Sequence, residues 1–456
     1  MNVPSARLPS RVRQIKSASS RDGDGVVYVG ILLLIVLVAV WQITQFEAVE
    51  GSWWSVFFEE SGPFLLPVIF AVLLGLGYFH ILSATRRKVW RVAPACFAAM
   101  VFVAYVWLTI PLAYLHGFDQ LKIWKDVAFA SAYGSAPLIY GLSLRRIVRL
   151  SGFWVWLSFA ASLLALAEAV RREIVVYQMG LGHFLQWTYR VFAGGGIELM
   201  YFSLGYVIAV HGQNQRPPRA LTALLVYGTL RFALNYTRLN WITAAVVIGL
   251  FAAFFARRRS LATLFRFVLI GALIFFIVSI AVLVGTAKGL RVSEHPLLQR
   301  VSSLADAPTE DVSVRFRMTE ARILLVLFTD YPVSGWGPGG TISPNDPDEP
   351  ERNEISVFFN GYPGLLYKFG LVGTALFLSA FSLTLWEARR ALRYSNVHPA
   401  IAGPLGGFSM LVLVGFVGTL FTDTIFANMG GVNASLFIGA ICAISRRGVT
   451  FGASGN

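Results

Sequence analysis

The chain has 456 residues, of which 56% are hydrophobic and 14% charged, and its mean hydropathy is +0.64. This composition is too apolar for an ordinary soluble domain and predicts an integral membrane protein. The formal net charge of +14 does not indicate nucleic-acid binding, because the basic residues lie in short clusters between apolar runs. The two cysteines both lie inside apolar runs and support neither a disulfide framework nor a zinc site.

The N-terminal part of the chain predicts a cytoplasmic tail followed by an anchor. Residues 1–25 are polar and basic, and Val26–Phe46 is the first apolar run. At about 20 residues this run is long enough to span the hydrocarbon core. No small-x-small cleavage site follows it, so we interpret it as a retained anchor instead of a signal peptide.

Later apolar runs bring the predicted number of transmembrane helices to about twelve. The run Ala220–Phe255 is too long for one helix and fits two short helices with a hinge near Asn235–Asn240. The other predicted spans are Pro63–Ser83, Val92–Leu112, Val127–Leu144, Phe153–Ala169, Gly196–His211, Arg266–Gly285, Tyr362–Trp386, Ile401–Phe421 and Ala427–Ile444. No internal repeat is visible, which weighs against the transporter folds that are built on repeats.

The basic clusters fall on every second loop if the N-terminus is cytoplasmic, as the positive-inside rule requires. They are Arg86/Arg87/Lys88/Arg91, Arg145/Arg146/Arg149, Arg216/Arg219, Arg257/Arg258/Arg259, Arg389/Arg390/Arg393 and Arg446/Arg447. We therefore predict an all-α polytopic protein with both termini cytoplasmic and one long extracytoplasmic loop. Its parts are a basic tail (1–25), helices one to nine (26–286), the outer loop (287–361), and the last three helices with a short tail (362–456).

Two arginines at membrane depth are the first candidates for a functional site. Arg231 and Arg238 are seven residues apart, so on one helix they would share a stripe with Asn235. A charge in the membrane is costly and normally faces a polar cavity or a partner. The alternative is that these side chains extend to the outer headgroups.

The outer loop holds more arginines and a glycine-rich turn. Val314–Phe328 has helical character, and its periodicity places Arg315 and Arg322 on one face and Arg317 on nearly the opposite face. Glu320 lies three residues after Arg317, so a surface ion pair between them is an alternative to a binding role. Gly335–Gly340 reads GWGPGG, a turn whose glycines allow close backbone approach.

Three motifs follow one another in a fixed order along the second half of the chain. The first is Tyr236-Thr-Arg238 before an apolar helix. The second is Arg317, followed after fourteen residues by Pro332-Val-Ser-Gly335-Trp-Gly337-Pro-Gly339, and the third is Asn360 with the later Gly370-Leu-Val-Gly373. In this order they resemble the helix start, the Arg…Pro-x-x-Gly-x-Gly-x-Gly block and the His-Asn…Gly-x-x-Gly block of the O-antigen ligase and O-antigen polymerase (Wzy-like) family.

The resemblance implies a metal-independent glycosyltransferase of the bacterial inner membrane, without a cofactor, whose active site faces the periplasm. Such enzymes transfer a glycan from undecaprenyl diphosphate to a sugar hydroxyl, and fixed guanidinium groups would stabilise the leaving diphosphate. The implied partners are this lipid-linked oligosaccharide, membrane lipid, and a chain-length regulator or flippase. The candidate catalytic residues are Arg238, Arg317 and Glu354, and the candidate substrate-binding residues are Arg231, Arg315, Arg322, Gly337, Gly339 and Asn360.

Glu354 is a candidate because this sequence departs from the family where ligases carry a histidine. That position is Phe359, which cannot accept a proton. Glu354 is the nearest carboxylate, Glu320 the next, and His295 is a weaker candidate in the same loop; reliance on the arginines alone is a further alternative. The missing histidine favours a polymerase, which joins lipid-linked repeat units, over a ligase, which transfers the glycan to lipid A-core.

Other readings of the same residues stay open. Asp346, Asp348, Glu349 and Glu351 could bind a divalent cation through oxygen ligands, although a solvated acidic run explains them as well. A transferase that uses polyprenyl-monophosphate sugars would place its acid in the first outer loop, within Glu47–Glu60. A flippase for lipid-linked oligosaccharides fits the span count but not the ordered arginine and glycine blocks.

Overall fold

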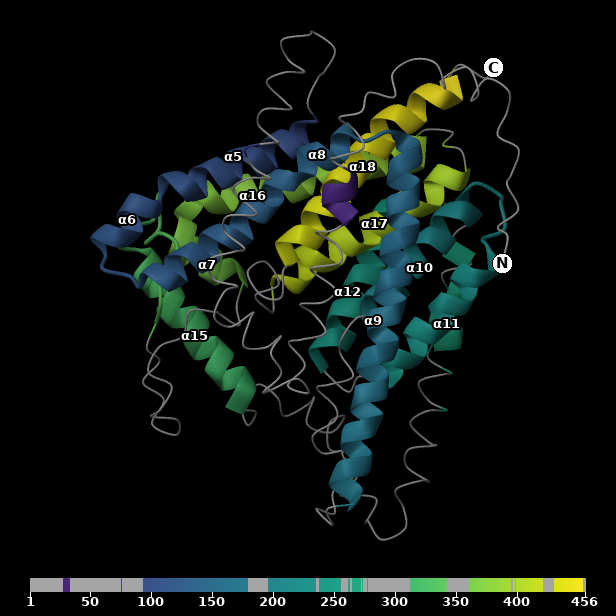
Figure 1. Cartoon of the computed structure of the whole chain (residues 1–456), viewed down its shortest axis with the longest axis horizontal. Helices are drawn as coiled ribbons and strands as arrows, with labels where there is room; N and C mark the ends of the chain where they lie inside the picture. Colours follow the sequence, from purple (N-terminus) through teal and green to yellow (C-terminus); the bar gives the residue numbers. More distant parts are fainter. Residues whose placement is uncertain are drawn as a thin grey trace.

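The structure is a bundle of α-helices (Figure 1). It is a computed structural model, and it describes residues 28–32, 75, 93–178, 196–234, 238–255, 261–262, 265–271, 273, 277, 312–342, 361–394, 397, 399–420 and 430–453. These residues contain no β-sheet, which confirms the predicted all-α class.

The labelled helices follow one another along the chain. Their bounds are α5 (Pro94–Leu108), α6 (Ile110–Leu115), α7 (Gln120–Ser131), the 3₁₀ helix η3 (Ala132–Ser135), α8 (Ala136–Gly141), α9 (Leu144–Gln178), α10 (Gly196–Gly212), α11 (Arg219–Leu234), α12 (Arg238–Phe255), α15 (Val312–Phe328), α16 (Gly361–Tyr394), α17 (Pro399–Gly418) and α18 (Gly430–Ala453).

Four of the described helices are long and apolar enough to cross a membrane. They are Pro94–Leu115, Leu144–Leu164, Gly361–Arg393 and Ile401–Gly418, and Trp241–Phe255 and Asn433–Arg446 are shorter apolar helices. Most residues of the predicted spans Val26–Phe46, Pro63–Ser83 and Arg266–Gly285 lie outside the described part of the chain. The protein is therefore a helical membrane protein, and the number of about twelve spans stays a prediction.

The predicted span Val127–Leu144 is wrong in its bounds. The helix begins at Gln120, where the Asp119 side chain accepts a hydrogen bond from the Leu121 backbone N–H at 3.2 Å and caps the first turn. It is interrupted at η3, before Pro137, and ends at Gly141. Proline lacks the N–H that would bond the carbonyl four residues earlier, which favours an interruption of the α-helix at this point.

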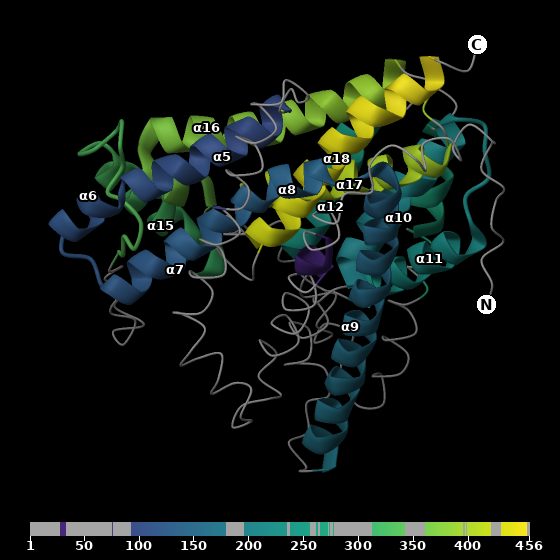
Figure 2. The same ribbon diagram turned by 45° about the horizontal axis from the view of Figure 1, so that its top comes forward.

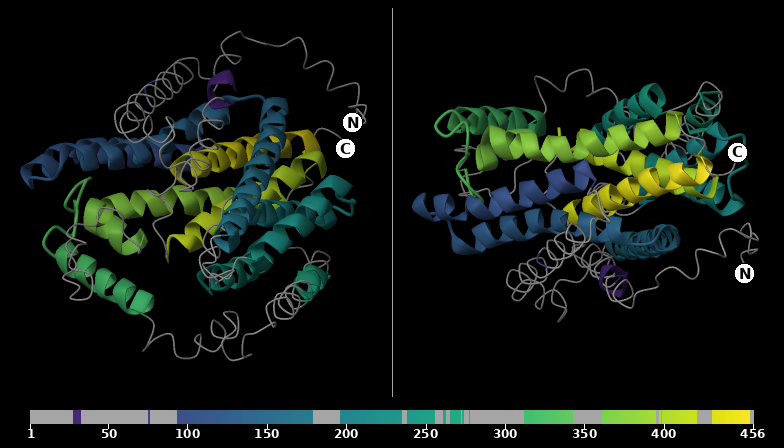
Figure 3. Two further views of the ribbon diagram at one scale, coloured as in Figure 1. Left: turned by 60° about the horizontal axis from the view of Figure 1, so that its bottom comes forward. Right: turned by 90° about the horizontal axis from the view of Figure 1, so that it is seen from above.

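The core around α5, η3 and α16 is rich in aromatic side chains. Phe102 packs edge-on against Tyr133 with ring centroids 5.9 Å apart, and against Phe377 at 5.6 Å. Figure 3 shows α16 running beside both α5 and α18, in agreement with the contacts between these helices. Offset and edge-on ring pairs of this kind add to the energy of apolar burial.

A second part of the bundle is built on close helix approach. Gly205 on α10 and Gly406 on α17 face each other so closely that a Cβ on either would meet the other's backbone. Small residues allow membrane helices to pack tightly, where lipid removes the hydrophobic drive for association. This contact fixes α10 against α17, and α11 packs on the other side of α10.

Helix α16 is kinked at Gly370, whose backbone has φ +61° and ψ −166°. The kink separates a short first segment, Gly361–Phe369, from the long apolar segment that follows. Figure 2 shows α15 at the same end of the molecule as α6, while α18 ends at the opposite end. The turn that follows α15 therefore meets α16 at its kink, and the candidate site is built there.

Candidate functional site

The glycine-rich turn predicted from the sequence follows α15 directly. Gly335, Gly337 and Gly339 have φ angles of +71°, +96° and +81°, a conformation that side chains with a Cβ rarely adopt. At Gly339 an added Cβ would also approach the Ile123 backbone nitrogen on α7 to 2.7 Å. The glycines thus let the turn fold sharply and pack directly on neighbouring backbone.

The turn and the kink at Gly370 satisfy each other's backbone groups. A kink removes hydrogen bonds between residues on its two sides, and an unpaired backbone group in a membrane is costly. Here the turn supplies the missing partners: two amides after the kink donate to the turn, and two carbonyls before it accept from the turn. These bonds are Leu371 N to Pro332 O (2.8 Å), Val372 N to Val333 O (3.3 Å), Trp336 N to Tyr367 O (2.8 Å) and Gly337 N to Lys368 O (2.8 Å).

A buried ion pair fixes the turn to two helices. Lys368 on α16 donates from Nζ to Oδ2 of Asp126 on α7 at 2.7 Å, and the Gly339 backbone N–H donates to the same oxygen at 2.6 Å. Asp126 is 5% exposed and Lys368 is 1% exposed. Because water is excluded, the pair is held by charge-assisted hydrogen bonds in a medium of low dielectric constant.

Next to the turn lies a cluster of rings around His116, which is half-buried between α6 and α7. Its ring centroid lies 4.8 Å from that of Tyr331, 4.7 Å from Trp336 and 5.8 Å from Phe118. His116 Nδ1 lies 2.8 Å from the carbonyl oxygen of Trp336. The turn, the ion pair and this aromatic cluster together form one compact site at the α6–α15 end of the bundle.

The helix predicted for Val314–Phe328 is confirmed as α15, which begins two residues earlier than expected. Arg317 is half-buried and Arg322 is exposed, in agreement with their predicted positions on different faces, and the Arg315 backbone is helical. Glu320 is fully buried. The alternative of an ion pair with Arg317 at the protein surface is therefore wrong, because Glu320 does not lie at the surface. The buried face of α15 packs on the first segment of α16, where Leu324 contacts Tyr367.

The prediction that Arg231 and Arg238 share one helical stripe is wrong. Arg231 lies in the last turn of α11, and Arg238 begins a separate helix, α12. Arg231 is 1% exposed and packs on Gly196, where an added Cβ would meet its side chain. The described residues contain two separate helices, as the two-helix interpretation of Ala220–Phe255 predicts, and the seven-residue periodicity applies only within one helix.

The structure unites some of the predicted site residues and not others. Gly337 and Gly339 lie in the docked turn, whereas α11 with Arg231 lies away from α15 in all views (Figures 1–3). Glu354 and Asn360 lie outside the described residues, and so do Phe359, His295 and the acidic run from Asp346 to Glu351. Among the described residues, no group of three His, Cys, Asp or Glu is placed to bind a metal ion.

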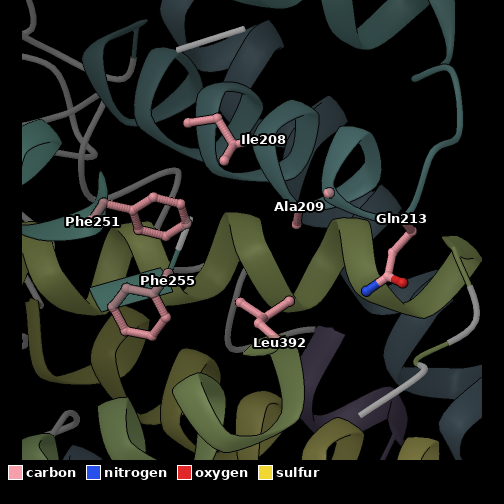
Figure 4. Close-up of a pocket in the computed structure, with 7 residues that line it drawn as sticks. Ile208, Ala209, Gln213, Phe251, Phe255 and Leu392 are labelled. Carbon is pink, nitrogen blue, oxygen red and sulfur yellow. The ribbon is translucent and has the colours of Figure 1, made fainter. Parts of the chain in front are cut away.

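A pocket elsewhere in the bundle is not part of this site. It lies between α10, α12 and the last part of α16, and Figure 4 shows it lined mainly by apolar side chains. Its lining includes Ile208, Phe251, Phe255 and Leu392, with Gln213 as a polar residue. It contains none of the predicted site residues, and we assign it no role.

Sequence reasoning missed Asp126, Lys368 and His116. Lys368 lies inside the predicted span Tyr362–Trp386, and a charge within a span is by itself a signal of a buried partner. Asp126 directly precedes the predicted span Val127–Leu144, so both charges lie near the outer ends of their spans in the predicted topology. Because Asp126 and Lys368 are predicted at the same depth in the membrane, the sequence could have suggested that they form an ion pair.

The protein is a helical membrane protein, because four described helices are long and apolar enough to span a membrane. Its candidate site is the turn after α15, which hydrogen bonds hold against α16. Residues 223–378 match the family model described as O-antigen ligase. The match runs from α11 through the turn to the part of α16 beyond its kink, and over this part of the chain it supports an assignment to the O-antigen ligase and polymerase family. A comparison with curated proteins gave no match. Members of this family are glycosyltransferase-like membrane enzymes, so the match supports a function of the ligase or polymerase type.

Proposed function

We propose that this protein polymerises a bacterial surface polysaccharide on the outer side of the inner membrane. It transfers a glycan from undecaprenyl diphosphate to a sugar hydroxyl of a second lipid-linked repeat unit. The family match supports the class of reaction. The absence of a histidine at Phe359, where ligases carry one, favours the polymerase over the ligase.

The observation that carries the proposal is the docking of the turn at the kink of α16. Loops are normally mobile, but this turn is fixed by backbone bonds across Gly370 and by the buried ion pair of Asp126 and Lys368. A site that stabilises a transition state needs groups held in place before the reaction begins. In the proposed topology this fixed turn lies where the lipid-linked substrate would leave the membrane.

In the proposed reaction, the acceptor oxygen forms a bond with the anomeric carbon of the donor sugar. The bond from that carbon to the diphosphate breaks, and undecaprenyl diphosphate leaves with the electron pair. Arg238 and Arg317 stabilise the charge on the diphosphate through paired hydrogen bonds. Supporting substrate contacts are proposed for Arg315, Arg322 and Asn360, and the arginines supply the positive charge without a metal. Gly337 and Gly339 are buried and their amides already donate to Lys368 and Asp126, so their proposed role is to shape the turn. Arg231 is buried on α11, away from the turn, and is not proposed to contact the substrate.

The proposal is tested by glycan transfer with purified protein and the lipid-linked repeat unit, without an energy source. We expect lipid-linked products that are longer by whole repeat units. Transfer to lipid A-core alone would identify a ligase, and movement of the lipid-linked unit across vesicles without new bonds would identify a flippase. In cells that lack the protein, we expect a single lipid-linked repeat unit to accumulate, since long lipid-linked chains would mean that polymerisation is intact.

A further inference from the structure

His116 is held in a way that defines which ring nitrogen carries the proton. A carbonyl oxygen only accepts hydrogen bonds, so the contact of 2.8 Å to Trp336 requires that Nδ1 donates. In neutral imidazole the other nitrogen, Nε2, then has a free lone pair. Within the described part of the chain, Nε2 makes no hydrogen bond. Among these residues the ring is thus oriented with the Nε2 lone pair available.

The surroundings of His116 fit a substrate-binding position. The ring packs against both Tyr331 and Trp336, which belong to the docked turn and contact each other, and Tyr331 is 38% exposed. The half-buried His116 therefore lies beside an open aromatic surface at the edge of the turn. Since the Trp336 backbone is itself bonded to α16, the imidazole is oriented by a part of the structure that is already rigid.

We propose that His116 is the general base that activates the acceptor hydroxyl. This inference rests on the proposed glycan transfer. Nε2 removes the hydroxyl proton as the oxygen bonds to the anomeric carbon, while the sugar–diphosphate bond breaks and the diphosphate leaves with the electron pair. The Trp336 carbonyl stabilises the imidazolium that results, and the proton then passes to water.

In this proposal His116 supplies the base that is missing at Phe359, although the two residues lie far apart in the sequence. His116 and Trp336 are separated by 220 positions, and only the fold brings them together. The sequence-derived alternative is Glu354. The two hypotheses assign the same proton to different bases. If His116 is the base, His116→Asn loses transfer and Glu354→Gln keeps it, and if Glu354 is the base the reverse holds.

The test replaces His116 in the full-length protein and measures transfer from the lipid-linked repeat unit. His116→Asn keeps an N–H that can donate to Trp336 but removes the basic nitrogen. We expect kcat to fall by about 100-fold or more, the usual scale for loss of a general base, with little change in KM for the donor. Added imidazole should restore part of the activity of His116→Ala, because it can enter the space left by the ring. His211→Asn, at the end of α10, is the matched control that keeps wild-type transfer.

Three outcomes would overturn the inference while leaving the proposed function intact. The first is wild-type kcat in His116→Asn, and the second is a hundredfold loss in Glu354→Gln while His116→Asn stays active. The third is faster hydrogen exchange of residues 331–342 in His116→Asn together with no imidazole rescue of His116→Ala, which would show that His116 only anchors the turn. Failure of the wild-type protein to transfer any glycan would instead refute the proposed function.

Discussion

Breaking the ion pair of Asp126 and Lys368 should release the glycine-rich turn. Asp126→Leu leaves the Lys368 ammonium, which is 1% exposed, without its carboxylate and leaves the Gly339 amide without its acceptor. Removing one partner of a buried pair costs about 3–5 kcal/mol. At about 1.4 kcal/mol per tenfold change, the open fraction of the turn should rise by about a hundredfold to a few thousandfold.

The double variant separates the charge effect from the loss of packing. Asp126→Leu with Lys368→Met replaces the buried pair by apolar side chains of similar size, an exchange that is often nearly neutral. The Gly339 N–H still lacks an acceptor, which costs about 1–3 kcal/mol. We therefore expect the double variant to open less than either single variant, so that its destabilisation is smaller than the sum of the two single effects.

Hydrogen exchange of residues 331–342, measured in lipid nanodiscs, reports directly on opening of the turn. Lys125→Met is the matched control, because it removes an exposed lysine from the same helix and should change stability by no more than about 0.5 kcal/mol. Unchanged exchange in Asp126→Leu would refute the idea that the pair anchors the turn. Equal or greater opening in the double variant than in the single variants would refute the charge argument.

Three further predictions concern the backbone, the arginines and the topology. Gly370→Ala should abolish transfer but not membrane insertion, because alanine disfavours φ +61° and its Cβ would meet the docked turn; normal polymer length on a gel would contradict this. Arg238→Ala and Arg317→Ala should each abolish polymer, with partial rescue by lysine, which lacks the bidentate fork; near-normal polymer in either variant would exclude that arginine from the site. A cysteine at Asp346 should react with an impermeant thiol reagent in intact spheroplasts and one at Ser260 should not, and the reverse result would overturn the orientation of the loop.

Much of the candidate site could be predicted from local sequence. The hydrophobic runs predicted helices, since a backbone in lipid must satisfy its own hydrogen bonds. The periodicity of α15 placed Arg317 and Arg322 on different faces, and the structure confirms their different exposure. The glycine block predicted a tight turn, because positive φ angles and close backbone approach depend on residue type alone. The same motifs carried the resemblance to the family that the comparison then supported.

Tertiary structure alone decided which distant groups complete the site. Asp126 and Lys368 are 242 positions apart, and no periodicity joins residues on separate helices. The periodicity of a single helix would place Arg231 and Arg238 on one stripe, whereas the structure has them in two helices, α11 and α12. The kink at Gly370 is stable because a turn from elsewhere in the chain pairs with the backbone groups it exposes. Likewise His116 acquires a defined tautomer only because the fold brings the Trp336 carbonyl to its Nδ1.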